Sequence, residues 1–176
     1  MILGCHCGMS GTEMMLGSVK EALGYRANAL MIYTGAPQNT IRKALKDLHI
    51  AEALKLMDEY NLDRKHLIIH APYIINPATT DPDKRDFCIN FLTQEVKRSY
   101  AMGSKVIVLH PGNTLGIPME EAIDNICSAV NQINYTCISN QAACIGFVIR
   151  IINNYITYIL RIINSCFSQI YHRQHS

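Results

Sequence analysis

The sequence predicts an α/β fold in which about four strand–helix units build a parallel sheet of the barrel type. Short apolar runs alternate with longer amphipathic segments through the first 130 residues, as in successive crossover units. Each expected strand ends in polar or conformationally special residues, and parallel folds place their chemistry at that end. The loop after the first strand lacks the GxGxxG motif of a doubly wound sheet. A barrel is therefore the better interpretation.

Four short apolar runs are expected to form the strands. They are too brief for helices, and the last is almost continuously apolar, which is typical of a parallel strand covered on both faces. The expected strands are residues 2–5, 29–33, 66–70 and 105–110.

Four amphipathic segments are expected to form the helices that connect the strands. Gly24 is a typical stop residue for the first helix, and Pro118 suits the first turn of the fourth. Apolar residues recur at three- and four-residue steps in the third. The expected helices are residues 10–24, 41–60, 83–102 and 118–131.

The composition of the chain changes near residue 135. The chain has 176 residues and a formal net charge of +2, yet all 14 acidic residues lie at or before Asp124. This bulk charge neither favours nor excludes nucleic acid as a partner. Residues 136–176 are apolar and acid-free, and we expect a helix over about 145–163. Arg150, Asn153, Asn154 and Arg161 interrupt the apolar stretch, which disfavours a membrane-spanning helix, and no membrane partner is expected.

The N-terminal residues and the cysteines indicate the cellular compartment of the protein. The first residues lack the basic stretch and long apolar run of a secretory signal, so a cytoplasmic location is expected. The seven cysteines include no CxxC pair and are expected to be free thiols. Cys5 and Cys7 are the closest pair. We expect the alternation of the first strand to point their side chains to opposite faces.

His70 and His110 each follow an apolar run and precede a loop that contains proline. Two imidazoles at the same height on neighbouring parallel strands can converge on one metal ion through neutral nitrogens. The alternative is that each ring caps its strand and hydrogen-bonds a loop carbonyl. The residues alone leave both interpretations open. His6 holds the corresponding place after the first strand, where it can simply line the site.

The loop over residues 34–43 and Tyr73 are candidates for contacts with nucleic acid. The loop carries amide side chains, including Gln38, and then the cations Arg42 and Lys43. Such groups can hydrogen-bond phosphates and base edges, although the loop can equally be a solvated turn that enters a helix. Tyr73 can stack on a base or insert into a duplex, or it can be a partly buried packing residue.

The four strand ends, in their order and spacing, resemble the endonuclease IV family. The motifs are Gly4-Cys5-His6-Cys7-Gly8-Met9-Ser10-Gly11, Met31-Ile32-Tyr33-Thr34-Gly35-Ala36-Pro37-Gln38-Asn39-Thr40, His70-Ala71-Pro72-Tyr73-Ile74-Ile75-Asn76 and Leu109-His110-Pro111-Gly112. The resemblance implies the N-terminal half of a TIM barrel with a trinuclear zinc site. It implies a hydrolase of base excision repair that cleaves double-stranded DNA on the 5′ side of abasic sites.

The resemblance also implies roles for individual residues. His70 and His110 match the family's first two zinc ligands, the only zinc ligands that this chain retains. Gln38 and Tyr73 match positions on loops that enter the DNA at the lesion, and Arg42 is a nearby candidate for a phosphate contact. Clustered zinc ions would lower the pKa of a bound water and neutralise the attacked phosphate.

The last part of the chain departs from the family. The fifth strand should end in a glutamate that bridges metals, but Ile145-Gly146-Phe147-Val148-Ile149-Arg150 has no carboxylate, and later ligands have no counterpart. We therefore divide the chain into an N-terminal half-barrel, residues 1–135, and a tail unlike the family, residues 136–176. Our hypothesis is that this tail results from a truncation or a frameshift in the coding sequence.

The frameshift hypothesis has a direct test in the coding DNA. Reading the codons for residues 130–145 in the other two frames should reveal a Glu-Thr or Glu-Asn motif. If neither frame encodes it, the hypothesis is lost.

Without the carboxylates, we expect this chain to be inactive even though its family cleaves DNA. One alternative is a non-enzymatic remnant that self-associates, because half a barrel leaves its first and fourth strands as open edges. Another is a sugar-isomerase-like TIM-barrel protein, which would use histidines and carboxylates with a divalent metal. Tyr73 and Gln38 favour the endonuclease over the isomerase.

Overall fold

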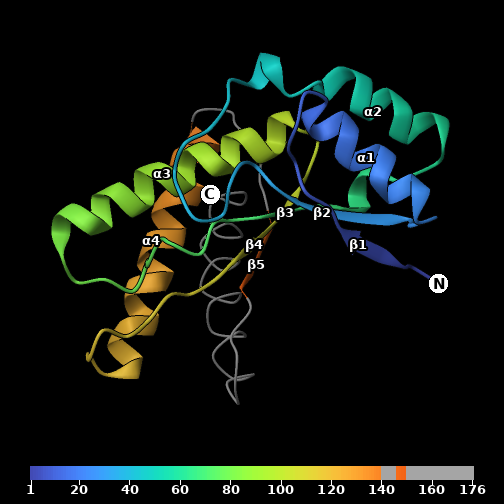
Figure 1. The fold of residues 1–176 in the computed structure, drawn as a ribbon. Helices are drawn as coiled ribbons and strands as arrows, with labels where there is room; N and C mark the ends of the chain where they lie inside the picture. Colours follow the sequence, from blue (N-terminus) through green and yellow to red (C-terminus); the bar gives the residue numbers. More distant parts are fainter. Residues whose placement is uncertain (140–145, 150–176) are drawn as a thin grey trace.

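The computed structural model describes residues 1–139 and 146–149, and it shows one parallel sheet (Figure 1). Neighbouring strands follow their order in the sequence, β1-β2-β3-β4-β5. Each of the four pairings is parallel. The strands are β1 (Gly4–His6), β2 (Ala29–Tyr33), β3 (Leu67–His70), β4 (Val106–Leu109) and β5 (Gly146–Ile149).

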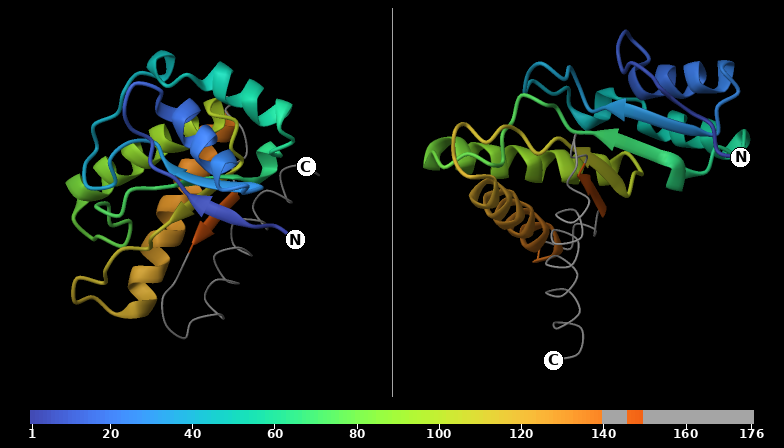
Figure 2. Two further views of the ribbon diagram at one scale, coloured as in Figure 1. Left: turned by 45° about the vertical axis from the view of Figure 1, so that its right-hand side comes forward. Right: turned by 90° about the horizontal axis from the view of Figure 1, so that it is seen from below.

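Helices alternate with the strands as predicted and gather around one face of the sheet (Figures 1 and 2). They are α1 (Met14–Gly24), α2 (Ile50–Glu59), α3 (Pro82–Ala101) and α4 (Met119–Ser139). Two single turns of 3₁₀ helix, Leu45–Asp47 and Arg64–His66, lie in the loops.

Alternation along the strands separates a helix-covered face from an opposite face. Side chains of β2, β3 and β4 that point to the helices are at most 1% exposed, and those that point the other way are half-buried, apart from the buried His70. In a closed barrel this second face would line the interior. The buried set is Leu30, Ile32, Leu67, Ile69, Ile107 and Leu109.

The helix predicted over residues 41–60 forms only in its second half, as α2. The side chain of Asn39 accepts a hydrogen bond from the backbone N–H of Ile41 at 3.0 Å, and this local turn competes with helix formation. His49 then adopts a left-handed conformation with φ 53°, which separates the loop from α2. Conversely, α4 runs past Asn131 to Ser139 because Ile133 continues its buried side.

Residues 146–149, near the start of the helix expected over 145–163, form a strand instead. β5 pairs with β4 from Val106↔Gly146 to Leu109↔Ile149. The prediction that the fourth strand is an open edge is therefore wrong, whereas β1 pairs only with β2 among the described residues. Residues 150–163 of the expected helix lie outside the described residues. None of the described helices has the length and apolar character needed to cross a membrane.

The thiols of Cys5 and Cys7 lie side by side, which corrects the prediction that they point to opposite faces. Side chains alternate with a period of two along a strand, so residues two apart share a face. The two Sγ atoms are 3.4 Å apart. Cys7 is buried in the core, and burial raises the pKa of its thiol to about 12. Cys5, Cys7 and Cys88 are free thiols, as expected.

Candidate metal centre at the carboxyl ends of the strands

Five aromatic rings gather where β1 to β4 end, and we call them the ring cluster: His6, Tyr33, His70, Tyr73 and His110. Ring centroids lie 4.8 Å apart for His6–Tyr33 and Tyr33–His70, and 4.9 Å apart for His70–His110. Tyr73 closes the group at 6.1 Å from His110. The parallel register aligns Tyr33 with His70, whereas His6 stands opposite Met31 and His70 opposite Val108, so His6 and His110 are each offset by two residues along their strands. The predicted convergence of strand-end residues is thus present in the structure.

His70 and His110 point their Nε2 atoms at each other at 3.1 Å. The Nδ1 atom of His70 lies 2.7 Å from the carbonyl oxygen of Ala71. A carbonyl only accepts, so Nδ1 carries the proton and the Nε2 of the neutral ring presents a lone pair. Histidines that bind metals orient themselves in this way, with the second nitrogen donating to a carbonyl. The carbonyl contact expected of a strand-capping ring is thus present at Nδ1, and metal binding at Nε2 stays a prediction.

The spacing of the two nitrogens suits a shared metal ion. Zinc–nitrogen bonds of about 2.0–2.1 Å at a tetrahedral angle separate two ligand nitrogens by about 3.3 Å. His70 is only 7% exposed, which restricts water around its ring. Burial also lowers the pKa of His6 and keeps this third ring neutral near pH 7. Its centroid lies 6.1 Å from that of His70.

The donor set is incomplete for zinc. Within residues 1–139 and 146–149, no group of three or more His, Cys, Asp or Glu side chains is arranged to hold a metal ion. Structural zinc takes four protein ligands and catalytic zinc takes three. The residues present fit the binding of one ion by two neutral nitrogens, with the other positions left to solvent.

Tyr33 and Tyr73 contribute the two phenol groups of the ring cluster. Burial, with a contribution from the neighbouring Tyr73, raises the pKa of the Tyr33 phenol, so its hydroxyl stays protonated. Tyr73 is 49% exposed, and its ring is accessible from solvent. Gln38 is also exposed, in the loop after β2. Both side chains predicted to enter DNA are therefore reachable.

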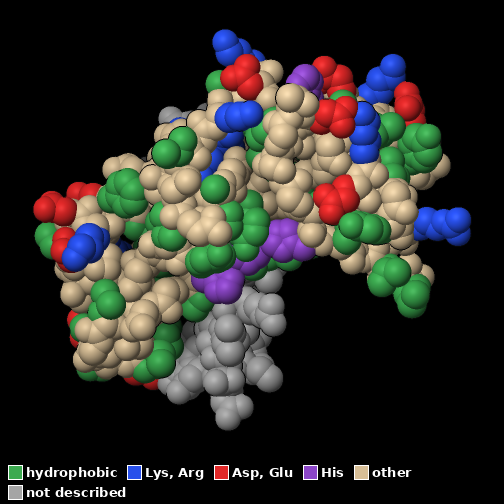
Figure 3. Space-filling view, viewed as in Figure 1, with side chains coloured by type: hydrophobic (Ala, Val, Ile, Leu, Met, Phe, Trp, Pro, Cys, Tyr) green, Lys and Arg blue, Asp and Glu red, His purple; other side chains and the backbone are tan. Residues whose placement is uncertain are grey.

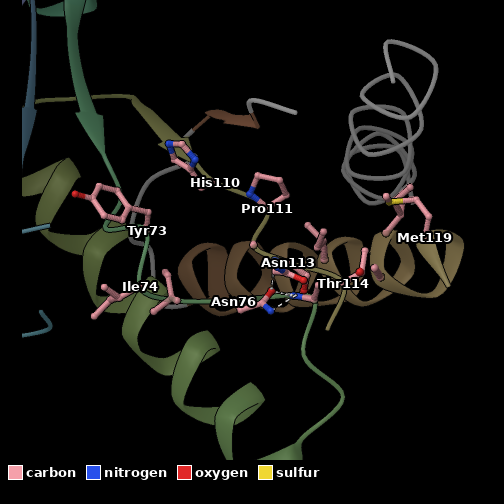
Figure 4. A pocket seen from close by; sticks show the side chains of 14 residues that line it. Tyr73, Ile74, Asn76, His110, Pro111, Asn113, Thr114 and Met119 are labelled. Atoms are coloured by element: carbon pink, nitrogen blue, oxygen red, sulfur yellow. Dashed lines mark hydrogen bonds between the residues drawn. The ribbon is translucent and has the colours of Figure 1, made fainter. Parts of the chain in front are cut away.

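A cavity of about 420 Å³ opens beside His110, between the loops that follow β3 and β4 (Figure 4). Asn76 ties these loops together. Its Nδ2 donates to the carbonyl of Asn113 at 2.7 Å, and its Oδ1 accepts from the backbone N–H of Ala78 at 3.1 Å. Gly112 passes beside the Asn76 side chain with φ +90°. The sequence marked Asn76 as a motif residue and gave no sign of this contact.

Arg42, predicted as a phosphate contact, is held inside the protein. Its Nε donates to Oε1 of Glu95 at 2.9 Å, and its Nη1 donates to the carbonyls of Asn39 and Ile41 at 3.0 and 2.9 Å. The guanidinium also stacks on Phe91, 5.1 Å from the ring centroid. Arg42 thus positions the loop that carries Gln38. A phosphate contact stays a prediction and would require the guanidinium to leave Glu95.

The surface around the histidines is mostly uncharged. On the face viewed in Figure 3, most of the visible histidine atoms form one patch at the lower centre, bordered above by hydrophobic side chains, and one histidine lies apart at the top. Lysines and arginines are scattered over the upper part and the margins of this face among acidic side chains. Recognition of a polyanion at this face would therefore depend on the loops and on a bound metal.

Comparisons with known proteins agree with the fold and with the strand-end motifs. Residues 19–160 match a family model described as xylose isomerase-like TIM barrel. A probable endonuclease 4 of Acholeplasma laidlawii is 50% identical over 133 residues, which cover 76% of this chain and 45% of that protein. A probable endonuclease 4 of Pediococcus pentosaceus is 49% identical over 134 residues, with the same coverage of 76% and 45%. The chain spans less than half the length of these relatives.

Solved structures show the same architecture at low sequence identity. Endonuclease IV from Thermus thermophilus superposes with a TM-score of 0.66 at 19% identity, over 83% of this chain and 50% of that one. D-psicose 3-epimerase from Clostridium cellulolyticum gives a TM-score of 0.66 at 14% identity, over 94% and 60%. At these identities the likeness shows the fold alone, and it confirms the predicted barrel type.

Proposed function

Because the chain belongs to the xylose isomerase-like TIM barrel family and is a homologue of endonuclease 4 over its N-terminal portion, we propose that it carries part of a zinc-dependent DNA-repair site. The proposed activity of the complete site is hydrolysis of the backbone on the 5′ side of abasic sites in double-stranded DNA. The pair of Nε2 atoms of His70 and His110, 3.1 Å apart, is the observation that carries the proposal.

Each residue has a role that its surroundings support. His70 and His110 would hold one zinc ion through Nε2, and the Ala71 carbonyl fixes the orientation of His70. Zinc would supply a bound hydroxide and neutralise phosphate charge. Tyr73 and Gln38 are exposed and would enter the duplex beside the lesion, where an aromatic ring replaces lost stacking. Arg42 keeps the Gln38 loop in place through Glu95.

We propose that this chain alone does not cleave DNA. The β5 strand, Gly146-Phe147-Val148-Ile149, carries no carboxylate at the place where the family resemblance calls for a bridging glutamate. Two neutral histidines cannot assemble several zinc ions, which need carboxylates as bridges. The division into residues 1–135 and a tail at 136–176 stays part of this proposal.

Zinc and abasic DNA test the proposal together. The purified chain is expected to bind zinc weakly, as measured by competition with a chromophoric chelator, and to leave a fluorescently labelled abasic duplex intact. His70→Ala and His110→Ala should each abolish the zinc binding. His49→Ala is the control, because His49 lies at the start of α2 and its Nδ1 is 3.5 Å from Oε1 of the exposed Glu52.

Two results would contradict this expectation. Metal-dependent incision that disappears in His70→Ala would show that the chain is active by itself. Unchanged zinc binding in both His70→Ala and His110→Ala would show that the two rings do not form a metal site.

The sugar-isomerase alternative rests on the epimerase-like structures and on the cavity beside His110. Ile75, Ala122 and Ile126 are among the side chains that line this cavity. A sugar presents many hydroxyl groups, and an apolar wall would leave them without hydrogen bonds. Asn76, His110 and Asn113 line the same cavity and could bind hydroxyl groups, so the preference for the endonuclease rests on Tyr73 and Gln38. The alternative of a self-associating, non-enzymatic remnant also predicts that the chain does not cleave DNA. Unlike the proposed site, it does not require the chain to bind zinc.

A further inference from the structure

Two thiols meet on the face of β1 opposite to the ring cluster. Cys5 and Cys7 flank His6, and their Sγ atoms lie 3.4 Å apart on the helix-covered face. Cys7 is 1% exposed, whereas Cys5 is half-buried and lies on the strand at the edge of the described sheet. A small reagent can therefore reach the pair from the side of Cys5.

The distance between the two sulfurs is closer to that of two ligands on one central ion than to that of a disulfide bond. A disulfide needs about 2.05 Å between the sulfurs, so they would have to approach by about 1.4 Å. Two residues along an extended strand also place the Cα atoms about 6.6 Å apart, near the upper limit for a disulfide. Two sulfurs on one tetrahedral ion, at about 2.3 Å each, lie about 3.8 Å apart. This arrangement needs a change of only about 0.4 Å.

We propose that Cys5 and Cys7 form a chelating site for one soft centre that accepts few ligands at a bent angle, of the class of trivalent arsenic. Thiolate sulfur selects such ions over hard cations. Because the described residues contain no group of three or more side chains arranged to hold a metal, the pair supplies two ligands and favours ions of low coordination number. The site does not depend on the function proposed for His70 and His110.

Binding of the ion exchanges bonds without any redox step. Two S–H bonds break and two bonds from sulfur to the ion form. With phenylarsine oxide as the probe, arsenic stays trivalent, and its oxygen leaves with the two thiol protons as water. The product is a ring that contains arsenic, both sulfurs and the backbone from Cys5 to Cys7.

The test is a titration of the reduced full-length chain with phenylarsine oxide. Intact mass spectrometry should show one adduct that survives a monothiol and is removed by 2,3-dimercaptopropanol. Iodoacetamide labelling followed by peptide mapping should find Cys5 and Cys7 protected together. Cys5→Ser and Cys7→Ser should each weaken binding at least tenfold. Cys88→Ser is the matched control, since Cys88 is a buried thiol on α3 and is also free.

The outcomes decide the proposal even if one variant fails to fold. Cys7→Ser changes a core position, so its circular dichroism spectrum is checked first, and the mapping on the unchanged chain does not depend on it. Joint protection of Cys5 and Cys7 with loss of the adduct in Cys5→Ser supports the site. An adduct at other cysteines, no adduct, or full affinity in Cys5→Ser overturns it.

Discussion

Replacing Glu95 with glutamine is expected to destabilise the chain by about 3–5 kcal/mol, the typical loss when a buried ion pair is left with one partner. The Glu95 side chain is fully buried, and that of Arg42 is only 9% exposed. Glu95 also accepts a hydrogen bond from the hydroxyl of Thr34, at the end of β2. Arg98 lies one turn further along α3, and its Nε and Nη2 are buried without a hydrogen-bond partner. A neutral glutamine would leave both guanidinium groups without a nearby negative charge.

Urea denaturation followed by circular dichroism measures this loss. Glu59→Gln is the matched control, because Glu59 is 52% exposed and 3.9 Å from Lys55, so its cost should stay below about 0.5 kcal/mol. The double variant Glu95→Gln/Arg42→Met removes one of the two stranded cations and should recover part of the stability. Equal costs for Glu95→Gln and Glu59→Gln would show that the buried pair does not hold the loop.

Gly112→Ala is expected to cost about 2–4 kcal/mol, through an unfavourable φ and a lost hydrogen-bonded tie. Gly112 has φ +90°, and an added Cβ would stand 2.0 Å from Oδ1 of Asn76 and 3.0 Å from its Cα. Because the Cα is backbone, the loop after β3 would have to move. His110 lies two residues before Gly112, so zinc binding should weaken as well.

Gly116→Ala separates the two causes of the loss. Gly116 has φ +89°, yet nothing lies within 4 Å of an added Cβ, so this variant bears only the conformational cost. Urea denaturation of both variants, with amide NMR shifts at Ala78 and Asn113, measures the difference. If both alanines cost the same, the contact with Asn76 contributes nothing to the loop.

The sequence predicted those features that depend on local periodicity. The strand at residues 29–33 was predicted with its observed bounds, because a run of five apolar residues stands between polar segments. His70 and His110 were predicted to converge because equivalent ends of parallel strands meet at one edge of the sheet. The structure adds the orientation of the rings, which depends on the carbonyl of Ala71.

Local periodicity does not reveal contacts between residues that are far apart in the sequence. Arg42 looked available for phosphate because its partner, Glu95, is 53 residues away in the sequence. A signal for Glu95 was nevertheless present, since it is a carboxylate on the apolar side of an amphipathic helix, between Leu92 and Val96. Such a residue needs a buried partner. The start of α2 was missed for another reason: His49 adopts a left-handed conformation that composition does not reveal.

The three-residue strand β1 decides which kind of metal each face of the sheet can attract. Gly4 packs so closely on Ala29 that an added Cβ would lie 3.0 Å from the Ala29 Cβ, and this contact resists sliding of the strand. A slip of one residue would turn His6 toward the helices and both sulfurs toward the ring cluster. Nitrogen ligands suited to zinc would then be joined by sulfur ligands suited to softer ions. Gly4, which offers no side chain as a ligand, thus keeps the nitrogen and sulfur ligands on separate faces of the sheet.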